Sequence, residues 1–324
     1  MTSKSRALLV LLCSMLCAGN VAAEAIHFLV PGGAGGGWDS TARGVGMVLR
    51  QAGFIESASF ENISGAGGGL AIATLIETAE RRQNVLMVNS TPILVRSLSG
   101  AFPYSYRDLT PVARLIGDYQ VLVARPDSGI DDFNDVLERF RRDRRLARVA
   151  GGSVRGDLDH LAPAMMLRAA GEDPRRMIYV PYDAGGRAIA GFMTGEADLL
   201  STGFSEALTY HRAGKLRIIA VSARERLPIA PDVPTIAETG TNFEFVNWRG
   251  FFAVPGLSAD EADRYSGLLR DMQSTAAWRE LRDRNGWQDL YQDRAAFSRF
   301  LESQEAQIRE QMIELGFYRE PRVK

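Results

Sequence analysis

The feature that most constrains the fold is an alternation of short apolar runs with amphipathic segments. Continuously apolar runs are typical of strands that are buried on both faces, and their alternation with helical patterns predicts parallel βαβ units. The amphipathic segments include residues 40–51 and 157–170. The predicted strands are Ile26–Val30, Ala58–Asn62, Val85–Asn89, Gln120–Arg125, Ala147–Gly151, Met177–Pro181, Asp198–Thr202, Leu216–Ser222 and Phe251–Val254.

The length of the chain points to more than one sheet. With 324 residues, the chain exceeds what one such α/β unit needs, so we expect two α/β lobes. Residues 124–133 read as an exit from the first lobe, and the Pro-rich residues 222–240 read as a return. Lobe 1 is therefore predicted to be discontinuous, with residues 24–124 plus 223–324, and lobe 2 to span residues 125–222. The tail from Asp260 onward is predicted to be helical.

The N-terminal segment reads as an export signal. Lys4 and Arg6 precede a short apolar stretch, and small residues up to Ala23 predict a signal peptide over residues 1–23 with cleavage before Glu24. Both cysteines, Cys13 and Cys17, lie inside it, without the small residues of a lipobox. The mature chain then has no disulfide, thiolate metal site or cysteine nucleophile.

Two glycine-rich stretches, residues 30–44 and 61–75, each follow a predicted strand and open a predicted helix. Ligands of α/β proteins bind at this position, where bare backbone N–H groups and helix N-termini favour anions. We therefore prefer a two-sided anion site to the alternative that the glycines only form tight turns. The candidate residues are Gly33, Ala34, Gly35, Gly36, Gly37, Trp38 and Asp39 in the first stretch, and Gly65, Ala66, Gly67, Gly68 and Gly69 in the second.

The anion is not expected to be a nucleotide. Gly32 and Gly37 have P-loop spacing, but Trp38 and Asp39 follow where Lys and a hydroxyl residue are required. The dinucleotide fingerprint fails as well, because Trp38 and Leu70 occupy its third glycine positions. A net charge of −1 gives no global attraction to nucleic acid. A small carboxylate needs only a few N–H donors and fits best.

Asp39 has two interpretations that the sequence leaves open. It either caps or electrostatically favours a helix N-terminus, or it holds a loop or an ordered water. Direct contact with an anionic ligand would require a protonated or cationic partner.

Further cleft candidates follow other predicted strands, each with a structural alternative. Ser90 and Thr91 either face the cleft or form a hydroxyl turn before Pro92. Asp157 reads more readily as an N-cap than as a ligand contact, and Arg249 more readily as a structural ion pair than as a ligand anchor. The remaining candidates at strand exits are Ser153, Tyr182, Asp183, Gly185, Ser201 and Thr202.

The inventory of reactive groups disfavours an enzyme. The three histidines, His27, His160 and His211, have no metal-ligand spacing, and no Gly-x-Ser-x-Gly elbow is present. We therefore expect no catalytic residue, no metal and no cofactor.

The motifs resemble those of the tripartite tricarboxylate transporter receptors, the TctC-like or Bug proteins. The resemblance is carried by "VPGGAGGGWDSTAR", "ENISGAGGGLA", "VPYDAGGRAIAGFMTGEADLLSTGFSE", "GKLRIIAVSARERLPIAPDVPTIAETG" and "NWRGFFAVPGLS", in this order along nearly the whole mature chain. Two positions depart from the usual pattern: Gly32 stands where an aromatic residue often follows the first proline, and Trp38 is bulkier than usual.

The resemblance implies an α/β, two-lobed periplasmic binding protein of type II-like fold with a ligand cleft between the lobes. It implies that the two glycine-rich loops grip one carboxylate of a di- or tricarboxylate-like acid, and that the receptor delivers it to a large and a small permease subunit. The chain is then a periplasmic monomer and not an enzyme. A carboxylate-sensing module for a signalling partner is the alternative.

Overall fold

The computed structural model describes residues 24–319 of the chain. The predicted signal peptide and its cleavage site before Glu24 concern residues outside this range, so both stay predictions. Among the described residues, no helix combines the length and the apolar character needed to cross a bilayer.

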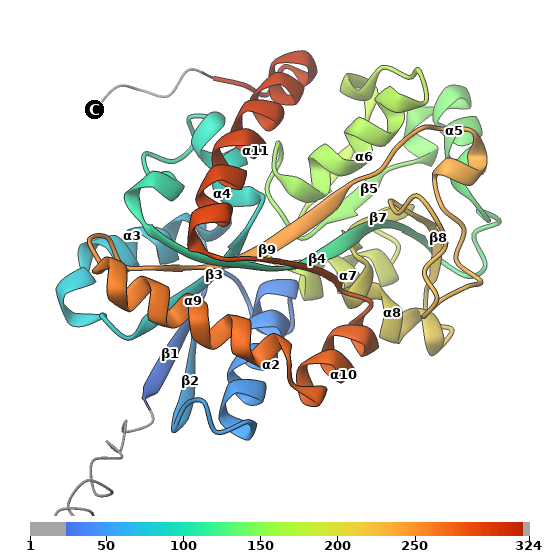
Figure 1. The fold of residues 1–324 in the computed structure, drawn as a ribbon. Helices are drawn as coiled ribbons and strands as arrows, with labels where there is room; N and C mark the ends of the chain where they lie inside the picture. The colour runs from blue at the N-terminus through green and yellow to red at the C-terminus, as the bar shows by residue number, and fades with distance from the viewer. Residues whose placement is uncertain (1–23, 320–324) are drawn as a thin grey trace, which may run out of the picture.

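The elements alternate along the chain much as the sequence predicts (Figure 1). The first part contains β1 (Ala25–Val30), α2 (Gly37–Gln51), β2 (Ser57–Asn62), η1 (Ala66–Gly68), α3 (Gly69–Glu77), η2 (Ala79–Arg81), β3 (Val85–Ser90), α4 (Pro92–Leu98) and η3 (Tyr106–Asp108). The middle part contains β4 (Thr110–Ala124), α5 (Phe133–Arg142), η4 (Arg144–Leu146), β5 (Val149–Gly151), α6 (Leu158–Ala169), η5 (Pro174–Arg176), β6 (Tyr179–Pro181), α7 (Gly185–Met193), β7 (Leu199–Gly203), α8 (Phe204–Arg212) and β8 (Arg217–Val221). The last part contains η6 (Ala237–Thr239), β9 (Val246–Ala253), α9 (Ala259–Gln273), α10 (Ala276–Asn285), β10 (Gln288–Gln292) and α11 (Arg294–Leu315).

The strands form two groups that share β4. The order is β2-β1-β3-β9-β4-β7-β5-β6, and β8 and β10 also pair with β4. The first half of β4, up to Tyr119, pairs with β9, whereas the second half, from Gln120, pairs with β7 and β8. Figure 1 shows β4 and β9 running through the middle of the molecule, with the early and C-terminal helices around one group and α5 to α8 around the other. This arrangement brings the ends of strands from both groups toward the middle.

Local signals in the sequence explain where many helices begin and end. Asp132 is the N-cap residue of α5 and forms a capping box. Its side chain accepts from main-chain N–H groups of the first turn, and the Asp135 side chain accepts from the main-chain N–H of Asp132. Gly286 and Gly316 end α10 and α11 in the left-handed conformation that glycine adopts without strain. In β4, Val121 and Val123 face one apolar cluster and Leu122 faces the other, so both faces of this strand are buried.

Each predicted strand is found, but two expectations about the sheet are wrong. The sheet is not purely parallel: β4 pairs antiparallel with β7, β8, β9 and β10, because it crosses between the groups rather than belonging to one βαβ unit. The tail is not wholly helical, because β10 adds a polar edge strand against β4. The predicted lobe limits stay a prediction, with the change of strand partners at Tyr119–Gln120 as the relevant observation.

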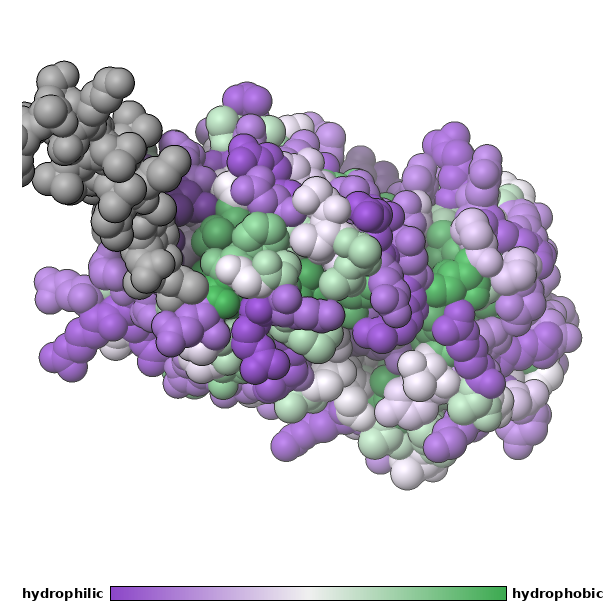
Figure 2. Space-filling model, turned by 60° about the horizontal axis from the view of Figure 1, so that its bottom comes forward, coloured by the Kyte–Doolittle hydropathy of each residue, from purple (hydrophilic) through white to green (hydrophobic). Residues whose placement is uncertain are grey.

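The surface seen in Figure 2 is mostly hydrophilic, and its apolar residues appear in separate recessed areas. Among residues 24–319, the large hydrophobic side chains that are exposed, Met47, Leu70, Met193 and Ile313, come from four different helices. Single exposed apolar residues of this kind are ordinary on a protein surface.

Candidate ligand-binding cleft

A cleft of about 120 Å³ lies where residues of both strand groups meet. Glycine-rich turns form one side, the starts of α6, α7 and α8 form the opposite side, and β4 and β9 form the floor. The residues around it are Pro31, Gly32, Gly33, Gly36, Gly37, Trp38, Gly65, Gly67, Gly68, Ser90, Pro92, Gln120, Gly152, Ser153, Asp157, Leu158, Asp159, Asp183, Ala184, Gly185, Gly203, Glu206, Asn247 and Arg249.

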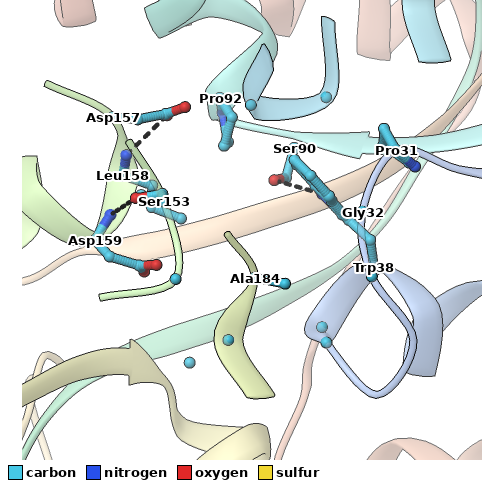
Figure 3. Close-up of a pocket in the computed structure, with 18 of the residues that line it drawn as sticks. Pro31, Gly32, Trp38, Ser90, Pro92, Ser153, Asp157, Leu158, Asp159 and Ala184 are labelled. Carbon is cyan, nitrogen blue, oxygen red and sulfur yellow. Dashed lines mark hydrogen bonds between the residues drawn. The ribbon is translucent and has the colours of Figure 1, made fainter. Parts of the chain in front are cut away.

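The first glycine-rich turn leads into the N-terminus of α2 at the cleft. Gly36 is the N-cap residue, with φ −80° and ψ 174°, and no side chain caps the helix. The first N–H groups of a helix have no intrahelical partners, so these donors are available beside the cavity. Trp38 Nε1 donates to Ser90 Oγ at 2.9 Å, which fixes the indole against the end of β3 (Figure 3).

Asp39 holds the first turn in shape. Its carboxylate accepts from Gly35 N at 2.9 Å, from Arg43 Nε at 2.8 Å and from Asn62 Nδ2 at 3.0 Å. Asn62 Nδ2 also donates to Gly32 O at 2.9 Å, which ties the turn to the end of β2. Burial opposes ionisation of Asp39, but these hydrogen bonds outweigh it and leave its pKa below the usual value. Of the two interpretations of Asp39, the loop-holding one describes its contacts.

The second glycine-rich turn requires glycine for its backbone. Gly65, Gly67 and Gly68 have φ of +131°, +61° and +90°, a region in which a β-carbon is strained. A β-carbon at Gly67 would also lie 3.1 Å from Arg96 Nε. The turn leads into α3, whose N-cap Gly68 provides no side-chain cap. Gly68 N and Leu70 N donate to Gly65 O, and Gly69 N donates to Ala66 O, so hydrogen bonds within the turn hold its shape. Gly65, Gly67 and Gly68 line the cleft without side chains in front of the backbone.

The opposite side is formed first by the β5–α6 turn. Ser153 Oγ accepts from Asp159 N at 3.0 Å, and Asp157 caps α6 by accepting from Leu158 N at 2.8 Å. Figure 3 shows Ser153, Asp157 and Asp159 on one side of the cavity and Ser90 and Trp38 on the other. The starts of helices from two strand groups thus face each other.

The starts of α7 and α8 reach across to the first glycine-rich turn. Ala184 precedes α7 with φ +91°, and a β-carbon at Gly33 would lie 3.2 Å from Ala184 Cβ. Glu206, in the first turn of α8, lies so close that a β-carbon at Gly36 would be 3.6 Å from its Oε1. Its carboxylate accepts a hydrogen bond from Thr202 Oγ1. The cleft is therefore narrow at this point.

The floor carries polar side chains from β4 and β9. Asn247 and Arg249 lie two residues apart on β9, so their side chains leave the same face of the strand. Arg249 is 3% exposed, and its Nη2 donates to Asp118 Oδ2 at 2.8 Å while Nη1 donates to Thr41 Oγ1 at 3.2 Å. A β-carbon at Gly37 would collide with the Arg249 guanidinium. Arg249 thus forms a buried ion pair with Asp118 at the floor of the cleft.

Two aspartates of the opposite side have strongly altered acidity. Burial raises the pKa of Asp157 to about 7, partly offset by its bond from Leu158 N and by the field of Arg96. Burial and the neighbouring Glu206 charge raise the pKa of Asp159 to about 7, although Gln120 Nε2 donates to it at 2.8 Å. Both carboxyl groups therefore exchange protons near neutral pH.

Comparison with known proteins shows which family the chain belongs to. Residues 43–316 match the model of the tripartite tricarboxylate transporter family receptor, TctC. The chain belongs to this receptor family.

Two curated relatives extend over most of the chain. A UPF0065 protein encoded between tcbD and tcbE in Pseudomonas sp. strain P51 is 28% identical over 248 residues, 75% of this chain and 72% of the relative. Protein BugT of Bordetella pertussis is 28% identical over 240 residues, 72% of each chain.

Solved structures share the fold. The periplasmic binding protein BugD is 22% identical and superposes with a TM-score of 0.81, covering 91% of this chain and 98% of BugD. MatC of Rhodopseudomonas palustris with bound malate is 21% identical, with a TM-score of 0.79 over 89% and 98% of the two chains. Rpa4515 of the same organism with adipate is 20% identical, with a TM-score of 0.82 over 91% and 98%.

These findings confirm the resemblance and the α/β periplasmic-binding-protein fold class. They also confirm the expectation that the chain is not an enzyme, because the family consists of substrate-binding receptors. Within residues 24–319, no group of three or more His, Cys, Asp and Glu side chains has the arrangement of a metal site.

The receptor's cleft brings together many, but not all, of the residues singled out from the sequence. Those that line it are Gly33, Gly36, Gly37, Trp38, Gly65, Gly67, Gly68, Ser90, Ser153, Asp157, Asp183 and Gly185. Those that stand outside its lining are Ala34, Gly35, Asp39, Ala66, Gly69, Thr91, Tyr182, Ser201 and Thr202. Some of the latter support it from behind: Asp39 binds Gly35 N, and Thr202 donates to Glu206. Which of them contact ligand stays a prediction.

Four polar or charged residues of the cleft were not among the candidates from the sequence: Gln120, Asp159, Asn247 and Glu206. Asp159 and Glu206 carry a local signal, because each stands in the first turn of a helix that follows a strand. Gln120 and Asn247 interrupt apolar strand patterns with a polar residue, which is the signal that could have found them.

Proposed function

We propose that this chain is a periplasmic receptor that captures a small organic carboxylate in the cleft and delivers it to a tripartite tricarboxylate-type membrane transporter. The partners are then the large and small permease subunits, and the receptor acts as a monomer with lobes at residues 24–124 plus 223–324 and at residues 125–222. Family membership supports this proposal, as does the cleft between the two strand groups.

One observation carries the carboxylate assignment. The N-termini of α2 and α3 both open onto the cleft, and neither has a side-chain cap. Helix N-termini offer N–H donors and partial positive charge, which together stabilise an anion. The absence of side chains at Gly36, Gly67 and Gly68 lets a carboxylate closely approach the N–H donors of α2 and the positive end of α3, whose own first N–H groups donate within the turn.

The size of the cleft agrees with a small acid. A cavity needs roughly 10–15 Å³ of this volume for each water-sized group, so about 120 Å³ accommodates roughly eight to twelve non-hydrogen atoms. Two of the structural neighbours hold acids of this size, malate in MatC and adipate in Rpa4515.

Calorimetry on the mature chain tests the carboxylate assignment. Pentanoate, glutarate and 5-aminopentanoate are titrated, with pentanamide as the matched neutral control for pentanoate. We expect at least one acid to bind and to stabilise the fold by about 2.7 kcal/mol at a concentration of 100 Kd. We expect pentanamide to bind less tightly than pentanoate. Equal binding of amide and acid, or binding of none of the acids, would contradict the assignment.

The transport role needs a separate measurement in cells. Uptake of the labelled acid is compared between a strain with the receptor, a strain without it, and a strain that carries the Gly67→Val variant. We expect uptake to require the receptor and to fall with the variant's affinity. Unchanged uptake without the receptor would contradict the transport role while leaving carboxylate binding intact.

A further inference from the structure

The two sides of the cleft differ in charge. The side formed by α6 and α8 presents the carboxyl groups of Asp157, Asp159 and Glu206, with Asp183 at the exposed rim. Of the described residues that line the cleft, Arg249 is the one basic side chain, and Asp118 already pairs with it at 2.8 Å. A second carboxylate of a ligand would therefore meet acidic groups on this side.

Helix capping accounts for the carboxylate of Asp157 in the cleft but not for those of Asp159 and Glu206. Asp157 accepts from Leu158 N and so caps α6. Asp159 instead accepts from Gln120 Nε2 and from the main-chain N–H of Gly152, and Glu206 accepts from Thr202 Oγ1. An ionised carboxylate has about four acceptor positions, so these bonds leave capacity for further donors.

Asn247, on the floor of the cleft, provides an independent sign that the cleft binds a polar ligand group. It lines the same cavity and is 6% exposed, and its Oδ1 has no hydrogen-bond partner among the described residues. A buried polar group without a partner costs free energy, so native structures satisfy nearly all of them. A polar ligand group beside Asn247 would satisfy this one.

We propose that Asp159 and Glu206, on the α6 and α8 side of the cleft, and Asn247, on its floor, bind a cationic donor group, so that the preferred ligand is a zwitterionic amino-carboxylate rather than a di- or tricarboxylate. This proposal rests on the proposed function, because the glycine-rich turns must hold the carboxylate end. The ammonium end then lies between two carboxylates and an amide oxygen, which are the acceptors that an ammonium requires.

Proton exchange on binding distinguishes an amino-carboxylate ligand from a dicarboxylate ligand. In the empty cleft, burial and mutual repulsion keep Asp159 partly protonated near neutral pH. A bound ammonium group would favour ionised Asp159, so binding at pH 7 would release protons. A second carboxylate of a dicarboxylate beside Asp159 would favour its protonated form, so binding of the dicarboxylate would take protons up.

Two matched ligand sets test the preference. The first set is 4-aminobutyrate, succinate and butyrate, and the second is 5-aminopentanoate, glutarate and pentanoate. Calorimetry at pH 7 in buffers of different ionisation enthalpy gives both affinity and proton exchange. We expect the amino acid of at least one set to bind about tenfold or more tightly than its dicarboxylate and its monocarboxylate, with proton release.

Two isosteric variants test the residues. Asp159→Asn and Glu206→Gln remove the charge but keep an oxygen for Gln120 and Thr202. We expect each to weaken binding of the amino acid about ten- to a hundredfold and to leave binding of the matching monocarboxylate within about threefold. The controls are Asp127→Asn and Glu225→Gln, which remove exposed carboxylates outside the cleft lining.

The possible outcomes distinguish a failure of this inference from a failure of the proposed function, carboxylate capture. Tighter binding of a dicarboxylate with proton uptake, equal binding within both sets, or an unchanged amino-acid preference in both variants would each overturn the inference and leave carboxylate capture standing. Binding of none of the six acids would contradict the proposed function itself.

Discussion

The two sides of the cleft use the same structural position in opposite ways. On both sides a strand ends, the chain turns, and a helix starts at the cavity. On the α2 and α3 side the turns consist of glycines and no side chain caps either helix. On the α6 and α8 side Asp157, Asp159 and Glu206 occupy the first turns. One side thus leaves its main-chain donors for a ligand, whereas the other brings its own carboxylates.

This difference teaches that a helix N-terminus is not by itself an anion site. The neighbours decide whether its partial positive charge is directed to a ligand or is already compensated. Asp39 illustrates the point within the glycine-rich side, because it is turned toward Gly35, Arg43 and Asn62 rather than toward the cavity lining.

The largest effect is expected at the floor that joins the two sides. Arg249→Met leaves Asp118 buried with the hydrogen bonds from Ser205 but without its cationic partner, and should lower the free energy of unfolding by about 3–5 kcal/mol. Arg249→Lys keeps the charge but loses the fork, so its loss should be smaller. Urea unfolding measures both. A stable Arg249→Met variant that no longer binds acids would instead make Arg249 the main ligand anchor.

The next effect is the pH dependence of stability that Asp157 and Asp159 cause. The folded-state pKa values of Asp157 and Asp159 are raised to about 7, so the native state holds more protons than the unfolded state between about pH 4 and pH 7. Stability without ligand should therefore fall as pH rises through this window, by a few kcal/mol for the pair.

Asp39 acts in the opposite direction. Its folded-state pKa is lowered, so its contribution is present above its unfolded pKa and is lost as the pH falls through its folded pKa. Melting curves of the wild type and Asp159→Asn across pH 5–8 isolate the contribution of Asp159, because Asp39, whose folded-state pKa is lowered, stays ionised over this range. The variant should show the flatter profile above pH 5, and identical profiles would contradict the raised pKa of Asp159.

A smaller effect, on carboxylate affinity, is expected from a substitution on the glycine-rich side of the cleft. Gly67→Val strains a backbone at φ +61° and places bulk against Arg96 at the cleft, so carboxylate affinity should fall about ten- to a hundredfold. Gly214→Val is the matched control, since Gly214 has φ +66° and open space around it, away from the cleft lining. The control should lose stability but keep its affinity. Equal losses of affinity in both variants would contradict a specific role of the second glycine-rich turn in binding the carboxylate.

The smallest effect is expected at Trp38. Trp38→Phe removes the hydrogen bond from Nε1 to Ser90 Oγ and should cost about 0.5–1.5 kcal/mol of stability. Affinity should change less than tenfold, because the main-chain donors of α2 remain. A loss of affinity larger than that of Gly67→Val would show that the indole itself, rather than the turn, shapes this side of the cleft.

Gly36 shows how far sequence reasoning about the turns extends. Two glycine-rich turns at strand ends were predictable, because strand and helix patterns are local and glycine runs stand out between them. The reason for each glycine was not. Gly67 needs a positive φ, whereas Gly36 has an ordinary extended backbone and lies beside Glu206. The sequence alone could not distinguish a conformational need from a steric one.

Long-range pairing explains the residues that sequence reasoning missed. Gln120 and Asn247 reach the cleft because β4 and β9 pair antiparallel through the middle of the molecule, and β10 was missed because its polar residues depend on β4 for partners. Such pairings bring together segments that are far apart in the chain, and no local period encodes them.

The sequence by itself determined the alternating elements, the two glycine-rich turns and the family motifs, because these depend on the conformational preferences of neighbouring residues. Only the tertiary structure decided which charges share the cleft. It brings Glu206 opposite Gly36, encloses the Arg249–Asp118 pair behind Gly37, and leaves Asn247 buried without a partner. Burial and charge proximity are properties of the packed molecule, so the contrast between the two sides of the cleft exists only after the chain has folded.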